Sequence, residues 1–453
     1  MHNHVIARCI EPLIDVGRSL PHYIHRSCLS YHQVHKFCLM RILVAVEELR
    51  VGGAQTFALR LAEALAVAGH DVYLYCMYWQ YTEHELVRRL APSVRLVQYE
   101  PAYRQVDTLL VRAEGWLFRR GIRLEWRQHR LVQHLRRVLA EQQIEAVSSN
   151  TFKCDALLAQ ALHTFPRVPL IVTMHGDYEQ FLRFSEQGRD NSIPGFKDLL
   201  SQTLQRINGI AYLSEQNLEC LRPEVAGVST SHILVRKIYN GLNGHVTADA
   251  ARYNRASLGI SPQALIMGMV ARGVPEKGWE PVITAFQRLN KELAMPMYLV
   301  LVGASPFLTE LEKKYQHDKS LRFLGFVNNP IDCIESFDVG ILASSLKESL
   351  PNSIAEYLFC GKAVISTDVG EIRQMIRTDE GQEAGILIDF PAEGLADPNQ
   401  LYEAMKSYAL NTPLLYQHQE WARQAFAKFD MSRCIAAYTE LYQDCMQQPA
   451  QAY

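Results

Sequence analysis

The stretch VGILASSLKESLPNSIAEYLFCGKAVIST, residues 339–367, contains the pattern of a strand, a short helix and a second strand. An apolar run typical of a buried strand opens it. Leu350–Pro351 is expected to begin the helix, because proline is favoured in the first helical turn, and Gly361 to end it as a C-cap glycine. Glu348 and Glu356 then lie near the carboxyl edge of a parallel sheet, where such sheets bind ligands.

The same alternation of apolar strands and amphipathic helices runs along most of the chain. The strand candidates are residues 41–46, 71–77, 94–99, 144–150, 169–174 and 209–214, then 265–270, 297–303, 321–326, 339–344, 363–367 and 385–389. A segment rich in Asn, Gly, Ala and Ser, residues 240–261, separates the two series and is typical of a hinge. We therefore predict an α/β protein with two Rossmann-like, doubly wound domains that face a cleft.

Four parts of the chain follow from this pattern. Residues 1–39 are rich in His and Cys without periodicity, and we expect a poorly ordered extension there. We expect that the start codon was assigned too far upstream; the alternative is a tail that binds a metal. Residues 40–240 and 241–430 are the two predicted domains. Residues 431–453 are expected to form a closing helix and tail that lie on one of the sheets.

Composition excludes several classes of function. The 453 residues include 46 basic and 48 acidic side chains, so no basic excess points to nucleic acid. The apolar runs fall short of the roughly 18 residues that a membrane span needs. The ten cysteines form no C-x-x-C pair, which favours reduced, buried cysteines in a cytoplasmic protein over a zinc site.

The start of the predicted helix, at Leu350, Pro351 and Asn352, offers chemistry suited to a diphosphate. Unpaired backbone N–H groups and the positive end of the helix dipole favour an anion there. Carboxylates accept hydrogen bonds from hydroxyl groups, and two of them beside a diphosphate cradle suit a nucleotide sugar. The alternative is that Glu348 and Glu356 are solvated surface charges, the usual fate of glutamate.

These residues resemble a known family. The two glutamates, separated by seven residues and followed by C-G-K-A-V-I-S-T, are similar to the motif of retaining glycosyltransferases of the family 4 type, which have the GT-B fold. Three further stretches are similar to the family's motifs, in the right order: residues 41–72, 238–243 and 270–286. The resemblance covers residues 40 to about 430, and it implies that the first domain binds the acceptor and the second the nucleotide sugar.

The resemblance also implies roles for individual residues. Arg272 and Lys277 would bind the donor diphosphate, Glu348 the hydroxyls of the donor sugar and Glu356 the ribose. The loop at Gly53 would let the backbone approach the phosphates, since glycine has no Cβ, although a plain tight turn is the alternative.

His175, which follows a predicted strand, occupies a position at which the family often has a histidine. It would act in catalysis beside Glu348, by orienting the acceptor or stabilising charge in the transition state. The alternative is a structural histidine, which is the commoner role for a lone histidine.

The implied reaction is transfer of a hexosyl or related sugar to a hydroxyl group with retention of configuration, through a front-face displacement. The chain contains no Asp-x-Asp triplet, and we expect no metal and no cofactor. The implied acceptor is a glycan or a lipid-linked molecule in the synthesis of cell-surface polysaccharide, lipopolysaccharide or glycolipid. We expect a cytoplasmic enzyme, peripheral on the inner face of the cell membrane.

Residues 104–137 combine nine arginines with three acidic residues and interleaved aromatics such as Trp116 and Trp126. Such a pattern suits an anionic membrane surface. An ordinary solvated helix that packs through its aromatics is the alternative.

The sequence departs from the family after residue 367. Glu371, Arg373 and Gln374 stand where the family often has glycine, proline and glutamate. This loop leaves open a catalytically inactive partner protein with the same fold. A sugar-nucleotide epimerase shares the fold and is a second alternative, whereas a Rossmann oxidoreductase is excluded because no G-x-G-x-x-G follows the first strand.

Overall fold

The computed structural model describes residues 39–50, 52–101, 103–118, 120, 126–186, 196–346 and 348–449. The expected N-terminal extension, residues 1–39, lies outside the described part of the chain except for Leu39. Residues Met40–Tyr453 form a single compact unit.

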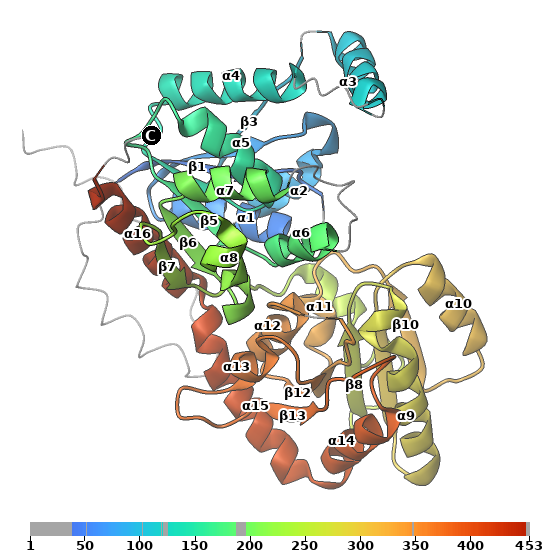
Figure 1. Cartoon of the computed structure of the whole chain (residues 1–453). Coiled ribbons are helices and arrows are strands. Elements are labelled where there is room, and N and C mark those ends of the chain that lie inside the picture. The colour runs from blue at the N-terminus through green and yellow to red at the C-terminus, as the bar shows by residue number, and fades with distance from the viewer. Residues whose placement is uncertain are drawn as a thin grey trace, which may run out of the picture. The chain divides into compact units, whose positions relative to one another are not determined.

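Seven parallel strands form the first sheet, in the order β3-β2-β1-β4-β5-β6-β7 (Figure 1). Their bounds are β1 Arg41–Val46, β2 Asp71–Cys76, β3 Arg95–Gln98, β4 Ala146–Ser149, β5 Leu170–Met174, β6 Gly209–Tyr212 and β7 Leu234–Lys237. The first six match the predicted strands. Strand β7 was not predicted because its side chains are only partly buried, as is usual for an edge strand.

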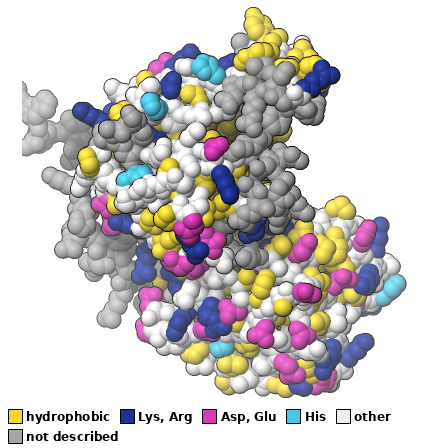
Figure 2. Space-filling model, viewed as in Figure 1, with side chains coloured by type: hydrophobic (Ala, Val, Ile, Leu, Met, Phe, Trp, Pro, Cys, Tyr) yellow, Lys and Arg dark blue, Asp and Glu magenta, His cyan; other side chains and the backbone are white. Residues whose placement is uncertain are grey.

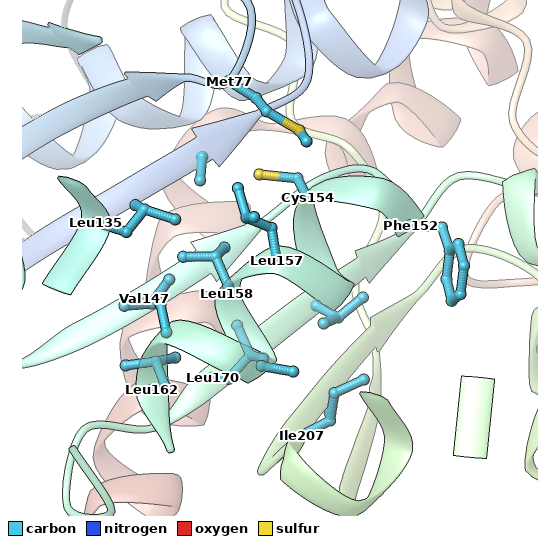
Figure 3. Close-up of a cluster of buried hydrophobic side chains, with 14 of the residues drawn as sticks. Met77, Leu135, Val147, Phe152, Cys154, Leu157, Leu158, Leu162, Leu170 and Ile207 are labelled. Carbon is cyan, nitrogen blue, oxygen red and sulfur yellow. The ribbon is translucent and has the colours of Figure 1, made fainter. Parts of the chain in front are cut away.

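Helices cover both faces of this sheet. They are α1 Gly53–Val67, α2 His84–Leu90, α3 Arg104–Phe118, α4 Trp126–Glu141, α5 Phe152–Leu162, α6 Asp177–Glu186, α7 Phe196–Arg206 and α8 Pro223–Ala226. Figure 3 shows the core under α5, where Leu157, Leu158 and Leu162 lie in one cluster with the strand residues Val147 and Leu170. Burial of these apolar side chains, at about 25 cal/mol per Å², fixes the helix on the sheet.

The second sheet is also parallel and has six strands, in the order β10-β9-β8-β11-β12-β13. Their bounds are β8 Leu265–Val270, β9 Met297–Val302, β10 Leu321–Gly325, β11 Val339–Leu342, β12 Ala363–Thr367 and β13 Gly385–Ile388. The strand order reverses between β8 and β11, as it does between β1 and β4 in the first sheet. This reversal creates the switch point at which doubly wound sheets place their ligands.

The helices of the second half again lie on two faces. They are α9 Trp279–Glu292, α10 Pro306–Lys314, α11 Ile331–Ile334, α12 Asn352–Phe359, α13 Ile372–Ile376, α14 Pro398–Leu410 and α15 Thr412–Phe426, and the last helix of the chain is α16 Met431–Gln447. Helices α9 and α14 share one core with the sheet, and α11, α12, α13 and α15 share the other. Two parallel sheets with helices on both faces confirm the predicted fold class.

The last helix, α16, returns to the first sheet. It packs against α1, β6 and β7 (Figure 1), and the hydroxyl groups of Tyr438 and Thr173 are 2.8 Å apart. The chain therefore crosses between the halves twice. The crossings are bonded to each other, because the N–H of Leu242 donates to the carbonyl of Phe429 at 2.8 Å.

Helix α3 presents apolar side chains to solvent. Val106, Leu109 and Trp116 are 52%, 62% and 47% exposed, and their spacing places them on one face. An ion pair of 3.1 Å between Asp107 and Arg130 connects α3 to α4. Within the described ranges, no helix is long and apolar enough to cross a bilayer.

Candidate functional site

The carboxyl ends of β8 and β11 bring Lys277 and Glu348 into contact. The Nζ of Lys277 donates to Oε1 of Glu348, and the hydroxyl of Ser344 donates to the same oxygen at 2.7 Å. Both charged side chains are largely buried, at 8% and 13% exposed. The structure thus brings together two residues that the sequence assigned to the same site.

Gly278 allows the two loops to approach. Its φ is +85°, and a Cβ at this position would lie 2.2 Å from the carbonyl oxygen of Ala343. A side chain cannot fit there, because real Cβ atoms do not come so close to a backbone oxygen. The glycine therefore fixes the position of Lys277, the residue before it.

Arg272 is placed differently. The residue is exposed, and its carbonyl accepts a hydrogen bond of 3.1 Å from the indole N–H of Trp279. In the described part of the chain its guanidinium group has no hydrogen bond or ion pair. Among the residues that the structure describes, no hydrogen bond or ion pair joins the Arg272 side chain to Lys277 or Glu348.

The helix start after Glu348 differs in detail from the prediction. Pro351 has φ −69° and ψ 120°, so it is the N-cap residue, and the helix begins at Asn352. The prediction that Leu350–Pro351 opens the helix was therefore early by one or two residues, a usual error at helix ends. Gly361 follows the C-cap with φ +63°, in agreement with its expected role.

The starts of α1 and α12 face each other. A Cβ on Gly53 would lie 3.9 Å from Nδ2 of Asn352. Each helix start carries unpaired N–H groups and a positive dipole end. The glycine loop of the first half and the helix start of the second half therefore lie at one place, which suits an anion.

A pocket lies beside these helix starts, between α1, the connection after β7 and α12. Its lining residues are Phe57, Arg60, Asn240, Gly241, Leu242, Leu350, Asn352 and Ala355. The side-chain oxygen of Asn240 is buried and has no hydrogen-bond partner among the described residues. Since buried polar atoms are usually paired, this oxygen is available to a hydroxyl or amino group of a ligand.

Glu356 lies on α12 and is only 7% exposed. Burial raises the pKa of its carboxyl group to about 7, and the charge of Arg60 opposes this rise. Burial also lowers the pKa of the Arg60 guanidinium, an effect opposed by Glu356. The two halves of the chain thus contribute opposite charges to the same region.

Arg60 was not predicted from the sequence. Gly53, Phe57 and Arg60 are spaced by four and three residues, so they share one face of α1. This spacing was the available signal, since Gly53 was already assigned to the site. What the sequence could not show is that this face meets α12.

His175 follows β5 and packs with Phe57, the ring centroids lying 5.5 Å apart. Its Nε2 atom is buried and has no hydrogen-bond partner within the described ranges. Burial lowers the pKa of the imidazole to about 4, so the ring is neutral near pH 7. The structure therefore places His175 next to the pocket, with which it shares Phe57, as an uncharged group.

Two family models match the sequence. "Glycosyl transferases group 1" matches residues 251–411, and "Glycosyltransferase Family 4" matches residues 51–243. Together they span most of the chain.

Each half of the chain thus matches a glycosyltransferase family model. A comparison of its sequence with curated proteins found no match.

Solved structures of GT-B glycosyltransferases share the fold. Anabaena HepE in complex with UDP superposes with a TM-score of 0.66 at 17% identity, covering 89% of this chain and 100% of HepE. Sucrose-phosphate synthase from Thermosynechococcus elongatus superposes with a TM-score of 0.62 at 18% identity, covering 89% of this chain and 98% of the synthase. WaaG superposes with a TM-score of 0.59 at 15% identity, covering 89% of this chain and 99% of WaaG.

The matched ranges contain every residue predicted for the site. Gly53 and His175 lie in the Family 4 range, and the second-half residues lie in the group 1 range. The two glycosyltransferase models support transferase activity.

Within the described residues, no group of three or more His, Cys, Asp or Glu side chains could hold a metal ion. The polar groups on or near the two helix starts and the pocket include the Lys277 ammonium paired with Glu348, the Arg60 guanidinium near Glu356, and the neutral imidazole of His175. They can bind hydroxyls and an anion at the same time.

Proposed function

We propose that this glycosyltransferase transfers a hexosyl or related sugar from a nucleotide sugar to a hydroxyl acceptor with retention of configuration. The observation that carries the proposal is the buried contact between Lys277 and Glu348 beside the start of α12. It places a cation and a carboxylate next to backbone N–H groups that can bind a diphosphate. Structures of HepE contain UDP and UDP-glucose, which supports a nucleotide-sugar donor for this chain as well.

In the proposed complex, the diphosphate lies between the starts of α1 and α12, and Lys277 and Arg272 neutralise the charge that develops on it. Glu348 accepts hydrogen bonds from the donor sugar, and Glu356 from the ribose. Preorganised charges of this kind lower the barrier because they need no reorganisation during the reaction. The leaving phosphate takes the proton of the acceptor hydroxyl on the same face of the sugar, and His175 orients that hydroxyl as a neutral group.

Titration calorimetry with UDP, GDP and ADP tests the donor proposal. One nucleotide should bind, and Lys277→Met should weaken its binding. Mass spectrometry of reactions with the matching nucleotide sugars and polyprenyl-linked acceptors then identifies the product, and NMR of the new glycosidic bond gives its configuration. Absence of binding by all three nucleotides would contradict the proposed function.

We also propose that transfer needs no metal ion and no cofactor. Lys277, Arg272 and the two helix starts supply the positive charge that a metal would otherwise provide. The purified enzyme should keep its turnover after treatment with EDTA and removal of the chelator. Loss of turnover that returns on addition of Mg²⁺ or Mn²⁺ would contradict this.

The acceptor is proposed to be a glycan or a lipid-linked molecule in the synthesis of cell-surface polysaccharide, lipopolysaccharide or glycolipid. WaaG, which shares the fold, is a glycosyltransferase involved in lipopolysaccharide biosynthesis. We place this enzyme in the cytoplasm, bound peripherally to the inner face of the cell membrane.

The surface proposed to bind the membrane is α3. Its exposed apolar residues, Val106, Leu109 and Trp116, adjoin basic ones, and the Arg120 guanidinium lies 3.7 Å from the Trp116 ring centroid. Figure 2 shows apolar and basic side chains together at the upper right, where Figure 1 places α3. Arg119 and Arg123, part of the same basic stretch, lie outside the described residues.

Sedimentation with vesicles tests this surface. The double variant Arg112→Glu/Arg120→Glu should reduce binding to vesicles that contain phosphatidylglycerol by about tenfold or more, since each basic residue contributes on the order of 1 kcal/mol. The control is Arg252→Glu, because Arg252 is 74% exposed and lies in the other half of the chain. Equal binding by all three proteins would contradict a membrane role for α3.

A further inference from the structure

Glu371, the first departure from the family pattern, is buried between the two halves. It is 6% exposed, and its Oε2 accepts hydrogen bonds of 2.9 Å from Nζ of Lys237 and from the hydroxyl of Tyr239. Lys237 ends β7 in the first sheet, whereas Glu371 lies between β12 and α13 in the second half. We call Lys237, Tyr239 and Glu371 the hinge cluster.

Further contacts hold the hinge cluster in place. The Tyr239 ring packs on Phe429, with centroids 5.3 Å apart, and Nζ of Lys237 lies 5.4 Å from the centre of the Tyr239 ring. A second carboxylate, Glu215, lies 3.9 Å from Lys237. Nearby, Nζ of Lys428 donates to the carbonyl of Gln374 at 2.7 Å. The segment after β12 is thus attached both to the end of the first sheet and to the second crossing.

The hinge cluster reaches the donor site through one residue. Gly370 precedes Glu371 and has φ +59°, and a Cβ on it would lie 1.5 Å from the carbonyl oxygen of Glu348. The backbone of Gly370 therefore lies directly against that of Glu348, the residue that contacts Lys277. Because the two backbones are in close contact, the position of the segment that contains Gly370 and Glu371 limits where the backbone of Glu348 can lie.

The geometry points to a further role in the reaction. We propose that Glu371 is a positioning residue. Lys237 of the first half and Tyr239 of the connection after β7 hold Glu371, and Glu371 thereby keeps Glu348 in place to bind the donor sugar. This proposal rests on the proposed function of Glu348. The donor-sugar site is then complete only when the two halves have the arrangement seen in the structure.

Physical chemistry indicates how the variants should behave. A buried charge that loses its partner is costly, whereas removal of both partners costs less. Lys237→Met and Glu371→Gln should each detach the segment 368–376 from the first half of the chain. The double variant should lose less stability than the sum of the losses in the two single variants. Lys237→Arg keeps the charge and should behave like the wild type.

Hydrogen exchange tests the positioning without any ligand. Lys237→Met should speed exchange about tenfold in residues 345–350 and 368–376 of the other half, as expected from loss of one charge-assisted hydrogen bond. The matched control is Arg373→Gln, which breaks ion pairs of the same segment, with Asp368 and Glu383, that stay within the second half. Unchanged exchange at 345–350, or an equal effect of Arg373→Gln, would overturn the proposal.

Calorimetry with UDP and UDP-glucose adds the functional readout; if GDP or ADP is the nucleotide that binds, that nucleotide and its glucose ester replace them. Lys237→Met and Glu371→Gln should weaken binding of the nucleotide sugar about tenfold and binding of the bare nucleotide less than about twofold. The reason is that, in the proposed complex, Glu348 contacts the sugar and no part of the nucleotide. Equal loss of both ligands would overturn the proposal. If the wild type binds no nucleotide, the proposed function fails, whereas the exchange experiment still decides whether the cluster positions Glu348.

Discussion

Glu356 has a carboxyl group that titrates far from the range of an exposed glutamate. Its pKa rises from 4.5 to about 7 because the side chain is buried. The charged group that faces it is Arg60 of α1, while the thiol of Cys333 stays neutral since burial raises its pKa. In the folded protein Glu356 therefore holds a proton over a pH range in which the unfolded chain has released it.

This difference predicts how stability depends on pH. Between about pH 4.5 and 7 the folded state binds more protons at Glu356, so its contribution to the free energy of unfolding falls as pH rises, and it stays low above pH 7. Glu356→Gln removes this slope. At pH 8 the variant should be more stable than the wild type by on the order of 3 kcal/mol, since a tenfold change in proton affinity corresponds to about 1.4 kcal/mol. Urea unfolding at pH 5 and pH 8 measures this, and an equal difference at both pH values would contradict it.

Variants of the Lys277–Glu348 pair distinguish its contribution to stability from its contribution to catalysis. Glu348→Ala leaves the Lys277 ammonium buried without its carboxylate, which should lower the free energy of unfolding by about 3 kcal/mol. The double variant Lys277→Met/Glu348→Ala should recover much of this loss, because no charge remains unpaired. Turnover should be lost in both proteins. Recovery of turnover in the double variant would show that neither residue binds the donor.

Several site residues could be predicted from the sequence because their neighbours along the chain define them. Lys277, Glu348 and Asn352 each follow a recognisable strand, and the carboxyl ends of parallel strands meet at one edge. Arg60 could not be found this way, because its role depends on contact between the two halves. The burial of Glu371 was equally hidden, since sequence spacing does not show which side chains become buried.

At the scale of the element, the loop that ends in Gly278 can be tested against a second glycine with a similar backbone. Gly278 and Gly259 both have positive φ, +85° and +65°, but a Cβ on Gly259 would meet no atom within 4 Å. Gly259→Ala should cost about 1–2 kcal/mol for the left-handed conformation alone. Gly278→Ala adds the collision with the carbonyl of Ala343, so it should cost clearly more and weaken nucleotide binding. Thermal unfolding and calorimetry measure both, and equal losses of stability would contradict this account.

Most elements were predictable for a simple reason. Strands buried on both faces appear as short apolar runs, and the observed strands β1, β8 and β12 have the predicted bounds. Edge strand β7 lacks such a run because water reaches part of it. The closing helix expected within residues 431–453 is α16, and its N-cap Asp430 separates it from the end of α15 and the short turn that follows.

At the scale of the whole molecule, α16 makes the stability of the first half depend on the end of the chain. Its buried residues include Tyr438, Leu441 and Tyr442, which pack on the first sheet. Removal of residues 431–453 should expose that face and unfold the first half before the second. Hydrogen exchange of β5 and β6 measures this, and the milder Tyr438→Phe should cost only about 1 kcal/mol through its hydrogen bond to Thr173. Normal protection of β6 in the truncated protein would contradict the prediction.

The two crossings between the halves also restrict how the halves can move. Because Leu242 is bonded to Phe429, and a Cβ on Gly241 would lie 2.9 Å from Cα of Met431, the two connections form one double-stranded pivot. Sliding or twisting of one half against the other would tear these contacts, whereas bending about the pivot keeps them. The distance between Gly53 and Asn352 should therefore increase only by hinge bending about the two connections. A disulfide that joins these two helix starts would prevent this bending.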